Sequence, residues 1–183
     1  MRFRKSRSAL IVGVMAVLLS LAVPANAEEP SDPILEGLVT PLGLAVGNDG
    51  SLYVAQSFAG TLTQVRKGAE SNLFEGAGVV PGVEATGRGN LSYLLNGELV
   101  VRTPNGKTRT LANLFEYEVA NNPDESNSYG FQDLSDECAA QVPDFPGGYP
   151  QPGVVDSNPY AVELMPNGDR IVADAGGNTL VQV

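Results

Sequence analysis

The sequence predicts an all-β protein, a β-propeller built of four-stranded antiparallel blades, of which about two to three are present. The first observation is an internal repeat. Residues 41–65 align without a gap with residues 159–183, at an offset of 118 residues, and eight aligned pairs are identical. The second is the spacing of the turns, because Gly50 and Gly89 lie 39 residues apart, close to the roughly 40 residues of a four-stranded propeller repeat.

The first predicted blade has four β-prone runs separated by turn residues. The Asn48-Asp49-Gly50 turn separates the first run from the second, and Gly, Asn and Asp are the residues that tight turns favour. The runs are residues 42–46, 52–56, 62–66 and 72–74.

The second and third blades follow the same pattern. Asn96-Gly97 lies between two apolar runs, which is a strong hairpin signal. The predicted strands are residues 82–85, 91–95, 98–102 and 108–111 in the second blade, and 160–164, 170–173 and 179–183 in the third. Apolar residues on the repeated strands are expected to form the core, namely Leu44, Val46, Leu52, Val54, Val172 and Leu180.

The start of the chain is typical of a secretory signal peptide. Four basic residues precede an apolar run over residues 9–23, and small residues at Ala25-Asn26-Ala27 supply a cleavage box. A retained membrane anchor is the alternative, but the run is short for a membrane span. We therefore expect processing after residue 27, export to an extracellular or periplasmic location, and no stable membrane span afterwards.

Charge and composition exclude several classes of function. After residue 27, seven basic and all 21 acidic residues remain, which gives a formal charge of −14, so nucleic acid and anionic membranes are not expected partners. The chain has no histidine and one cysteine, Cys138. A Ser-His-Asp triad, a Cys-His pair, a histidine-ligated metal and an intramolecular disulfide are therefore excluded.

A long irregular segment interrupts the repeat over about residues 115–158. It is rich in Asn, Asp, Glu, Pro and Gly and has no sustained period, apart from a short helical turn expected within residues 111–120. Loops of this length in a compact domain tend to be functional or disordered. Residues 142–159, which contain Phe145 and Tyr149, are either a solvated connection or a loop that binds a ligand or partner.

The candidate site residues are carboxylates and amides near the ends of blades. Those that bracket the long segment are candidates for ligand binding: Glu118, Asn122, Asp124, Asp156 and Asn158. Asp174 and Asn178, which flank the Ala175-Gly176-Gly177 turn, are candidates for a metal. Oxygen ligands of this kind suit calcium or another divalent cation, although Asp and Asn also stabilise turns through their own side chains.

Three stretches resemble the ScyD/ScyE family of exported bacterial proteins, over most of residues 38–183. They are TPLGLAVGNDGSLYVAQS, GELVVRTPNGKTRTLANLFEYEVANNPD and DSNPYAVELMPNGDRIVADAGGNTLVQV. The resemblance implies a propeller related to NHL-repeat and gluconolactonase-like six-bladed proteins, and related lactonase propellers hold a divalent ion near the central channel. Family members are long enough to close a ring. Because the third blade here stops before its outer strand, we expect a truncated product or fragment that self-associates through open blade edges.

Two classes of function follow. The first is an exported binding or scaffold module for a protein, peptide or small-molecule ligand, with no established cofactor and no catalytic residues. The alternative is a metal-assisted, lactonase-like hydrolase or lyase that uses carboxylates on a bound cation. The sequence favours the binding module, because no carboxylate pair in it can be assigned acid and base roles.

Overall fold

The computed structural model describes residues 31–142 and 148–183. Residues 35–183 form one compact unit, and the predicted signal segment, residues 1–27, lies outside the described residues. Within the described ranges no helix is both long and apolar enough to cross a membrane.

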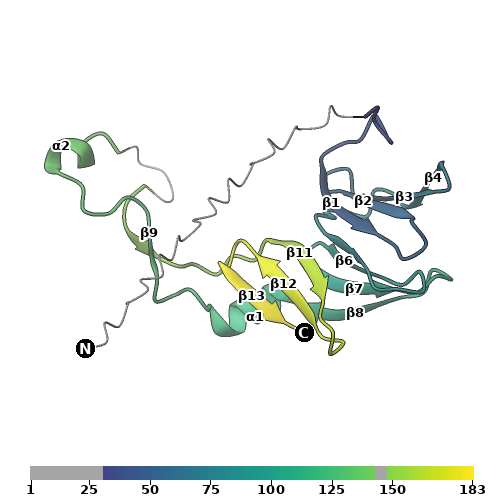
Figure 1. Ribbon diagram of the computed structural model, residues 1–183. Coiled ribbons are helices and arrows are strands. Elements are labelled where there is room, and N and C mark those ends of the chain that lie inside the picture. The colour runs from purple at the N-terminus through teal and green to yellow at the C-terminus, as the bar shows by residue number, and fades with distance from the viewer. Residues whose placement is uncertain (1–30, 143–147) are drawn as a thin grey trace, which may run out of the picture. The chain divides into compact units, whose positions relative to one another are not determined.

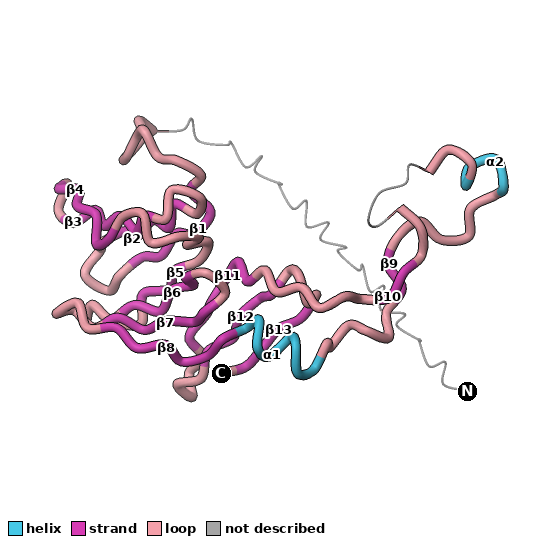
Figure 2. Tube along the Cα trace, turned by 180° about the vertical axis from the view of Figure 1, so that it is seen from behind, coloured by secondary structure: helices cyan, strands magenta, loops and turns pink. Residues whose placement is uncertain are grey.

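Strands dominate the structure and pair in chain order (Figures 1 and 2). The first sheet contains β1 (Pro41–Val46), β2 (Leu52–Gln56), β3 (Thr61–Arg66) and β4 (Ala69–Phe74). The second sheet contains β5 (Val83–Ala85), β6 (Leu91–Leu95), β7 (Glu98–Arg102) and β8 (Thr108–Asn113). The third contains β11 (Pro159–Leu164), β12 (Arg170–Asp174) and β13 (Thr179–Gln182).

Every neighbouring pair of strands in these sheets is antiparallel and consecutive in the chain. Up-and-down sheets that follow one another along the chain have the topology of propeller blades. The described chain therefore confirms the predicted fold class, with two four-stranded blades and a third of three strands, which together form a partial propeller.

The inner strands of the three sheets approach one another closely. β1 contacts β5, and β11 contacts both β5 and β1. A Cβ atom at Gly43 would lie 2.8 Å from the carbonyl oxygen of Pro81, and one at Gly82 would lie 2.6 Å from that of Tyr160. Glycine is required at both positions because any larger residue would push the inner strands apart.

Two apolar clusters hold the sheets together. Successive residues of a strand point to opposite faces, so β6 sends Tyr93 toward the first sheet and Leu94 toward the third. The first cluster contains Ala45, Tyr53, Ala55, Leu62, Val80, Val83, Leu91, Tyr93 and Val100. The second contains Leu94, Leu99, Leu114, Val162, Val172 and Val181. The second sheet is thus buried on both faces.

The predicted core is partly wrong. Val54 and Val172 are buried as expected and Leu52 is half-buried. In contrast, Leu44, Val46 and Leu180 are 66%, 61% and 71% exposed. The alignment identified the strands correctly, but these three residues lie on the faces of the first and third sheets that turn away from the second sheet, where no other sheet of the described chain packs.

Short elements occupy the segment between the second and third sheets. α1 (Leu114–Asn121) confirms the expected helical turn, and α2 (Asp136–Ala139) is a second, shorter helix. β9 (Ser128–Tyr129) pairs with β10 (Gln151–Pro152) as a two-stranded antiparallel ribbon. The segment is therefore not structureless, and this ribbon brings two parts of it together.

Candidate functional site

The helix α1 carries Glu118 to the edge of the third sheet. Asn113 caps the helix, because its side chain accepts a hydrogen bond of 3.0 Å from the backbone N–H of Glu116. Leu114 and Glu118 are four residues apart and share one helical face. Leu114 packs into the core between the second and third sheets, and Glu118, one turn later, is fully buried.

The helix ends at Asn122, which directs the chain toward the buried Asp124. Asn122 adopts the left-handed conformation, with φ 33° and ψ 68°, and its N–H donates to the carbonyl of Glu118 at 2.8 Å. This is a common way to end a helix, and asparagine tolerates it better than most residues. The Asn122 side chain then donates to the carbonyl of Gly153 at 3.4 Å.

Asp174, at the end of β12, organises the turn that faces Glu118. Its Oδ1 accepts hydrogen bonds from the backbone N–H groups of Asn158, Gly176 and Gly177, at 2.6, 3.0 and 3.3 Å. Its Oδ2 accepts a bond of 2.6 Å from the Ser157 hydroxyl. A buried carboxylate with this many donors is well satisfied, so Asp174 ties the entry of β11 to the turn after β12.

Asn178 and two glycines complete the contact between helix, loop and turn. The Asn178 side chain donates to Oδ2 of Asp124 at 2.8 Å, across 54 residues of sequence. At Gly177 a Cβ atom would lie 2.5 Å from Oε2 of Glu118, and at Gly153 it would overlap the Asp124 carboxylate. The two glycines therefore leave room for these acids. We call Glu118, Asn122, Asp124, Asp174 and Asn178 the acid–amide cluster.

Several oxygens of the cluster are buried without a partner. Among the described residues no hydrogen bond reaches Oε1 or Oε2 of Glu118, Oδ1 of Asn122 or Oδ1 of Asp124. Burial raises the pKa of Glu118, and the nearby negative charges of Asp124 and Asp174 raise it further. Burial and these charges therefore keep the carboxyl of Glu118 neutral over a wider pH range than in water.

The structure brings together five of the seven residues that the sequence singled out. Asp156 and Asn158 take part only through their backbones, since their side chains are exposed and the Asn158 side chain donates to the Tyr160 hydroxyl at 3.3 Å. Within residues 31–142 and 148–183, no three acidic, histidine or cysteine side chains are arranged to hold a metal ion. A divalent cation on Asp174 and Asn178 stays a prediction.

Sequence reasoning missed Ser157, Gly153 and Gly177 as parts of the cluster. Ser157 lies between the candidates Asp156 and Asn158, and Gly177 lies next to the candidate Asn178, but only carboxylates and amides were considered as site residues. Gly153 gave no signal, because the requirement for glycine there comes from the Asp124 carboxylate, which is 29 positions away in the sequence.

No protein-family model matches this sequence, and no curated protein matches it. Among solved structures, virginiamycin B lyase from Staphylococcus aureus is 16% identical, with a TM-score of 0.39, over 73% of this chain and 48% of that one. A protein from Lactobacillus plantarum is 13% identical, with a TM-score of 0.43, over 82% and 42%. PQQ-bound aldose sugar dehydrogenase from Streptomyces coelicolor is 15% identical, with a TM-score of 0.39, over 77% and 39%. The chain spans less than half the length of each.

Proposed function

We propose that the chain is an exported binding or scaffold module of the ScyD/ScyE type. The observation that carries this proposal is that both ends of the long segment between the second and third sheets are fastened at its base, while apolar side chains farther along it are exposed. We call the described part of this segment, residues 128–142 and 148–152, the arm.

The acid–amide cluster fastens the base of the arm. Asp124 lies just before the arm and Gly153 just after it, and the Asp124 carboxylate lies against Gly153. Asn122 donates to Gly153, and Asn178 joins Asp124 to the turn of the third sheet. Fixing the ends of a loop lowers the conformational entropy that the loop loses when it binds a partner.

The arm presents a surface suited to a macromolecular partner. Phe131 and Tyr149 are 53% and 51% exposed, and Leu134 is also exposed. Acidic residues lie beside them, at Asp133, Asp136 and Glu137. Aromatic side chains commonly anchor interfaces, and the surrounding negative charge favours a protein or peptide partner that is basic around an apolar pocket.

The alternative, a metal-assisted hydrolase or lyase, receives less support from the cluster. The oxygens of Asp174 already accept four hydrogen bonds, three of them from the backbone, so using this residue as a metal ligand would require breaking some of them. Glu118 is fully buried and its pKa is raised. A hydrolase needs a base that solvent and substrate can reach, and both residues are buried in this conformation.

Site-specific crosslinking in the exporting organism tests the proposal. A photoreactive residue at position 131 or 149 should give a discrete crosslinked product, whereas the same residue at the exposed position Lys107, on the turn between β7 and β8, should not. In parallel, the purified full chain is assayed for lactone and ester hydrolysis with and without calcium. Calcium-dependent turnover, together with no crosslink specific to the arm, would favour the enzyme over the binding module.

A further inference from the structure

A second region of the molecule differs from the acid–amide cluster in charge and in exposure, because arginines line it and it is open to solvent. A cleft of about 470 Å³ opens between the first and second sheets. The turns that follow β1 and β5 line it, so it lies at the end of the strands opposite to the turn after β12. Its polar and charged walls include Asn48, Asp49, Arg66, Arg88, Asn90 and Arg102.

Positive charge is concentrated at this cleft. Only seven basic residues follow residue 27, and three of them, all arginines, line this one cavity. Asp49 is the single acidic residue in its lining. The cleft therefore carries a local formal charge of +2 on a chain whose mature charge is −14. A concave patch of one sign with low-dielectric walls concentrates ligands of the opposite sign.

The turn after β5 presents Arg88 to the cleft. Gly87, Arg88 and Gly89 all have positive φ, at 81°, 51° and 74°. Asn90 holds this turn, because its backbone N–H and its side chain both donate to the carbonyl of Gly87, at 2.9 and 3.1 Å. Arg88 itself is exposed and makes no hydrogen bond or ion pair among the described residues. A left-handed arginine is unusual, and here its guanidinium is free for a ligand.

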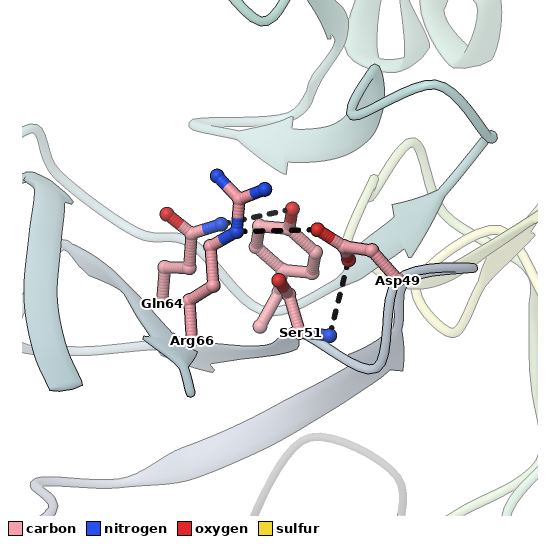
Figure 3. A network of polar contacts seen from close by, with 5 residues as sticks. Asp49, Ser51, Gln64 and Arg66 are labelled. Atoms are coloured by element: carbon pink, nitrogen blue, oxygen red, sulfur yellow. Dashed lines mark hydrogen bonds and ion pairs between the residues drawn. The ribbon is translucent and has the colours of Figure 1, made fainter. Parts of the chain in front are cut away.

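On the opposite wall Asp49 orients Arg66 without using all of its donors (Figure 3). Oδ2 of Asp49 lies 3.3 Å from Nε of Arg66, and Oδ1 of Asp49 accepts a bond of 3.1 Å from the N–H of Ser51. Hydrogen bonding from Ser51 lowers the pKa of Asp49, so this carboxylate stays ionised. The ion pair is exposed on both sides, and such pairs contribute little to stability. The terminal guanidinium nitrogens of Arg66 are left for other acceptors.

Arg102 and neutral side chains complete the cleft. Arg102, the last residue of β7, is half-buried and donates only a long bond of 3.4 Å, to the carbonyl of Thr103. Gln64 and Tyr53 lie beside Arg66 and are joined by a bond of 3.1 Å from the amide to the hydroxyl. Leu73 and Leu91 add apolar wall. The lining thus combines cationic, neutral polar and apolar groups, as ligand pockets do.

We propose that this cleft binds a small organic oxyanion, a carboxylate or phosphate carried on a hydroxylated body of about the size of one sugar. Arginine forks match the geometry of carboxylate and phosphate groups. Amides and the tyrosine hydroxyl can exchange hydrogen bonds with ligand hydroxyls. The cleft is built from the first two sheets alone, so the inference is independent of the arm and its partner.

Calorimetric titration of the full chain with three probes tests the inference. Glucuronate carries a carboxylate, glucose 6-phosphate carries a phosphate, and glucose carries no charge. At least one of the two anions should bind with a dissociation constant of about 1 mM or lower, and glucose at least about tenfold more weakly. The better anion identifies which oxyanion the cleft prefers. Raising the salt concentration should weaken anion binding, because Arg66 and Arg88 are exposed to solvent.

Matched variants locate the binding. Arg88→Gln and Arg102→Gln should each weaken binding of the preferred anion about tenfold or more, because each removes a charged hydrogen-bond donor to the oxyanion. Arg109→Gln, which removes an exposed arginine on β8 outside the cleft, should leave affinity unchanged. The circular dichroism of each variant confirms folding. Absence of anion binding to about 10 mM, equal affinity for glucose, or equal losses in all three variants would overturn the inference.

Discussion

The acid–amide cluster and the arginine-lined cleft lie at opposite ends of the strands, and they differ in how much water reaches their charges. Glu118, Asp124 and Asp174 are buried, and the hydrogen bonds to the two aspartate side chains come from backbone N–H groups and from the side chains of Ser157 and Asn178. The charges of the cleft are exposed or half-buried, and Arg88 has no described partner. Buried carboxylates therefore fasten a loop at one end of the strands, whereas charged side chains at the other end stay accessible to solvent.

The largest expected effect separates two aspartates that occupy similar turns. Asp174→Ala should lower the free energy of unfolding by about 3 kcal/mol or more, because buried N–H groups of the turn lose their acceptor. Asp49→Ala removes an exposed carboxylate and should leave stability close to that of the wild type. Urea denaturation of both variants measures the difference. Equal losses of unfolding free energy in the two variants would show that burial does not distinguish the two regions.

A second comparison concerns the glycines beside the acids. Gly153→Ala should cost about 1–3 kcal/mol of unfolding free energy, because its methyl group would overlap the side chain and the backbone of Asp124. Gly47→Ala, at the cleft, would meet Oδ1 of Asp49 at 3.0 Å, the end of an exposed side chain that can move, and should cost less. Thermal melts compare the stability of the two variants. A larger loss in Gly47→Ala than in Gly153→Ala would contradict the packing described around Asp124.

The pH dependence of stability sharpens the comparison further. In the folded chain Glu118 holds its proton to a pH above its ordinary value of 4.5, because burial and neighbouring acids raise its pKa. The folded state then binds more protons than the unfolded state in this window, so the free energy of unfolding falls as pH rises through it. Glu118→Gln should flatten this fall and increase stability at neutral pH by about 1 kcal/mol. Denaturation curves between pH 4 and 8 test it, and identical pH profiles for both proteins would contradict it.

Features that local interactions determine could be predicted from the sequence, whereas features that depend on packing between distant segments could not. β6 and β7 were predicted residue for residue, because two apolar runs and the Asn96-Gly97 turn between them are local signals. The exposure of Leu44 and Leu180 was not predictable from the repeat, since aligned strands in different sheets need not have a neighbour on the same face. The burial of Glu118 depends on how α1 docks over Gly177. The arginine cleft was missed because Arg66 and Arg88 meet only after two sheets pack.

The smallest expected effect on stability concerns the apolar faces turned away from the second sheet. We propose that Leu42, Leu44 and Val46 of β1, together with Leu180 of β13, promote association between copies of this chain. Leu44→Ser and Leu180→Ser should each change the free energy of unfolding by no more than about 0.5 kcal/mol, as at other exposed positions, while reducing association. Light scattering during size-exclusion chromatography measures this. A wild-type chain that stays monomeric at all concentrations would contradict the proposal.

The fastening of the arm to the third sheet is tested most directly by a double-mutant cycle between Asp124 and Asn178, whose side chains are 2.8 Å apart. The cycle combines Asp124→Ala with Asn178→Gly, because residue 178 has a φ of 48° and glycine accepts that conformation. The account predicts a coupling of about 1 kcal/mol or more in the free energy of unfolding, as is usual for residues in one hydrogen-bonded network. Additive effects, within about 0.3 kcal/mol, would mean that the arm is not held by this contact.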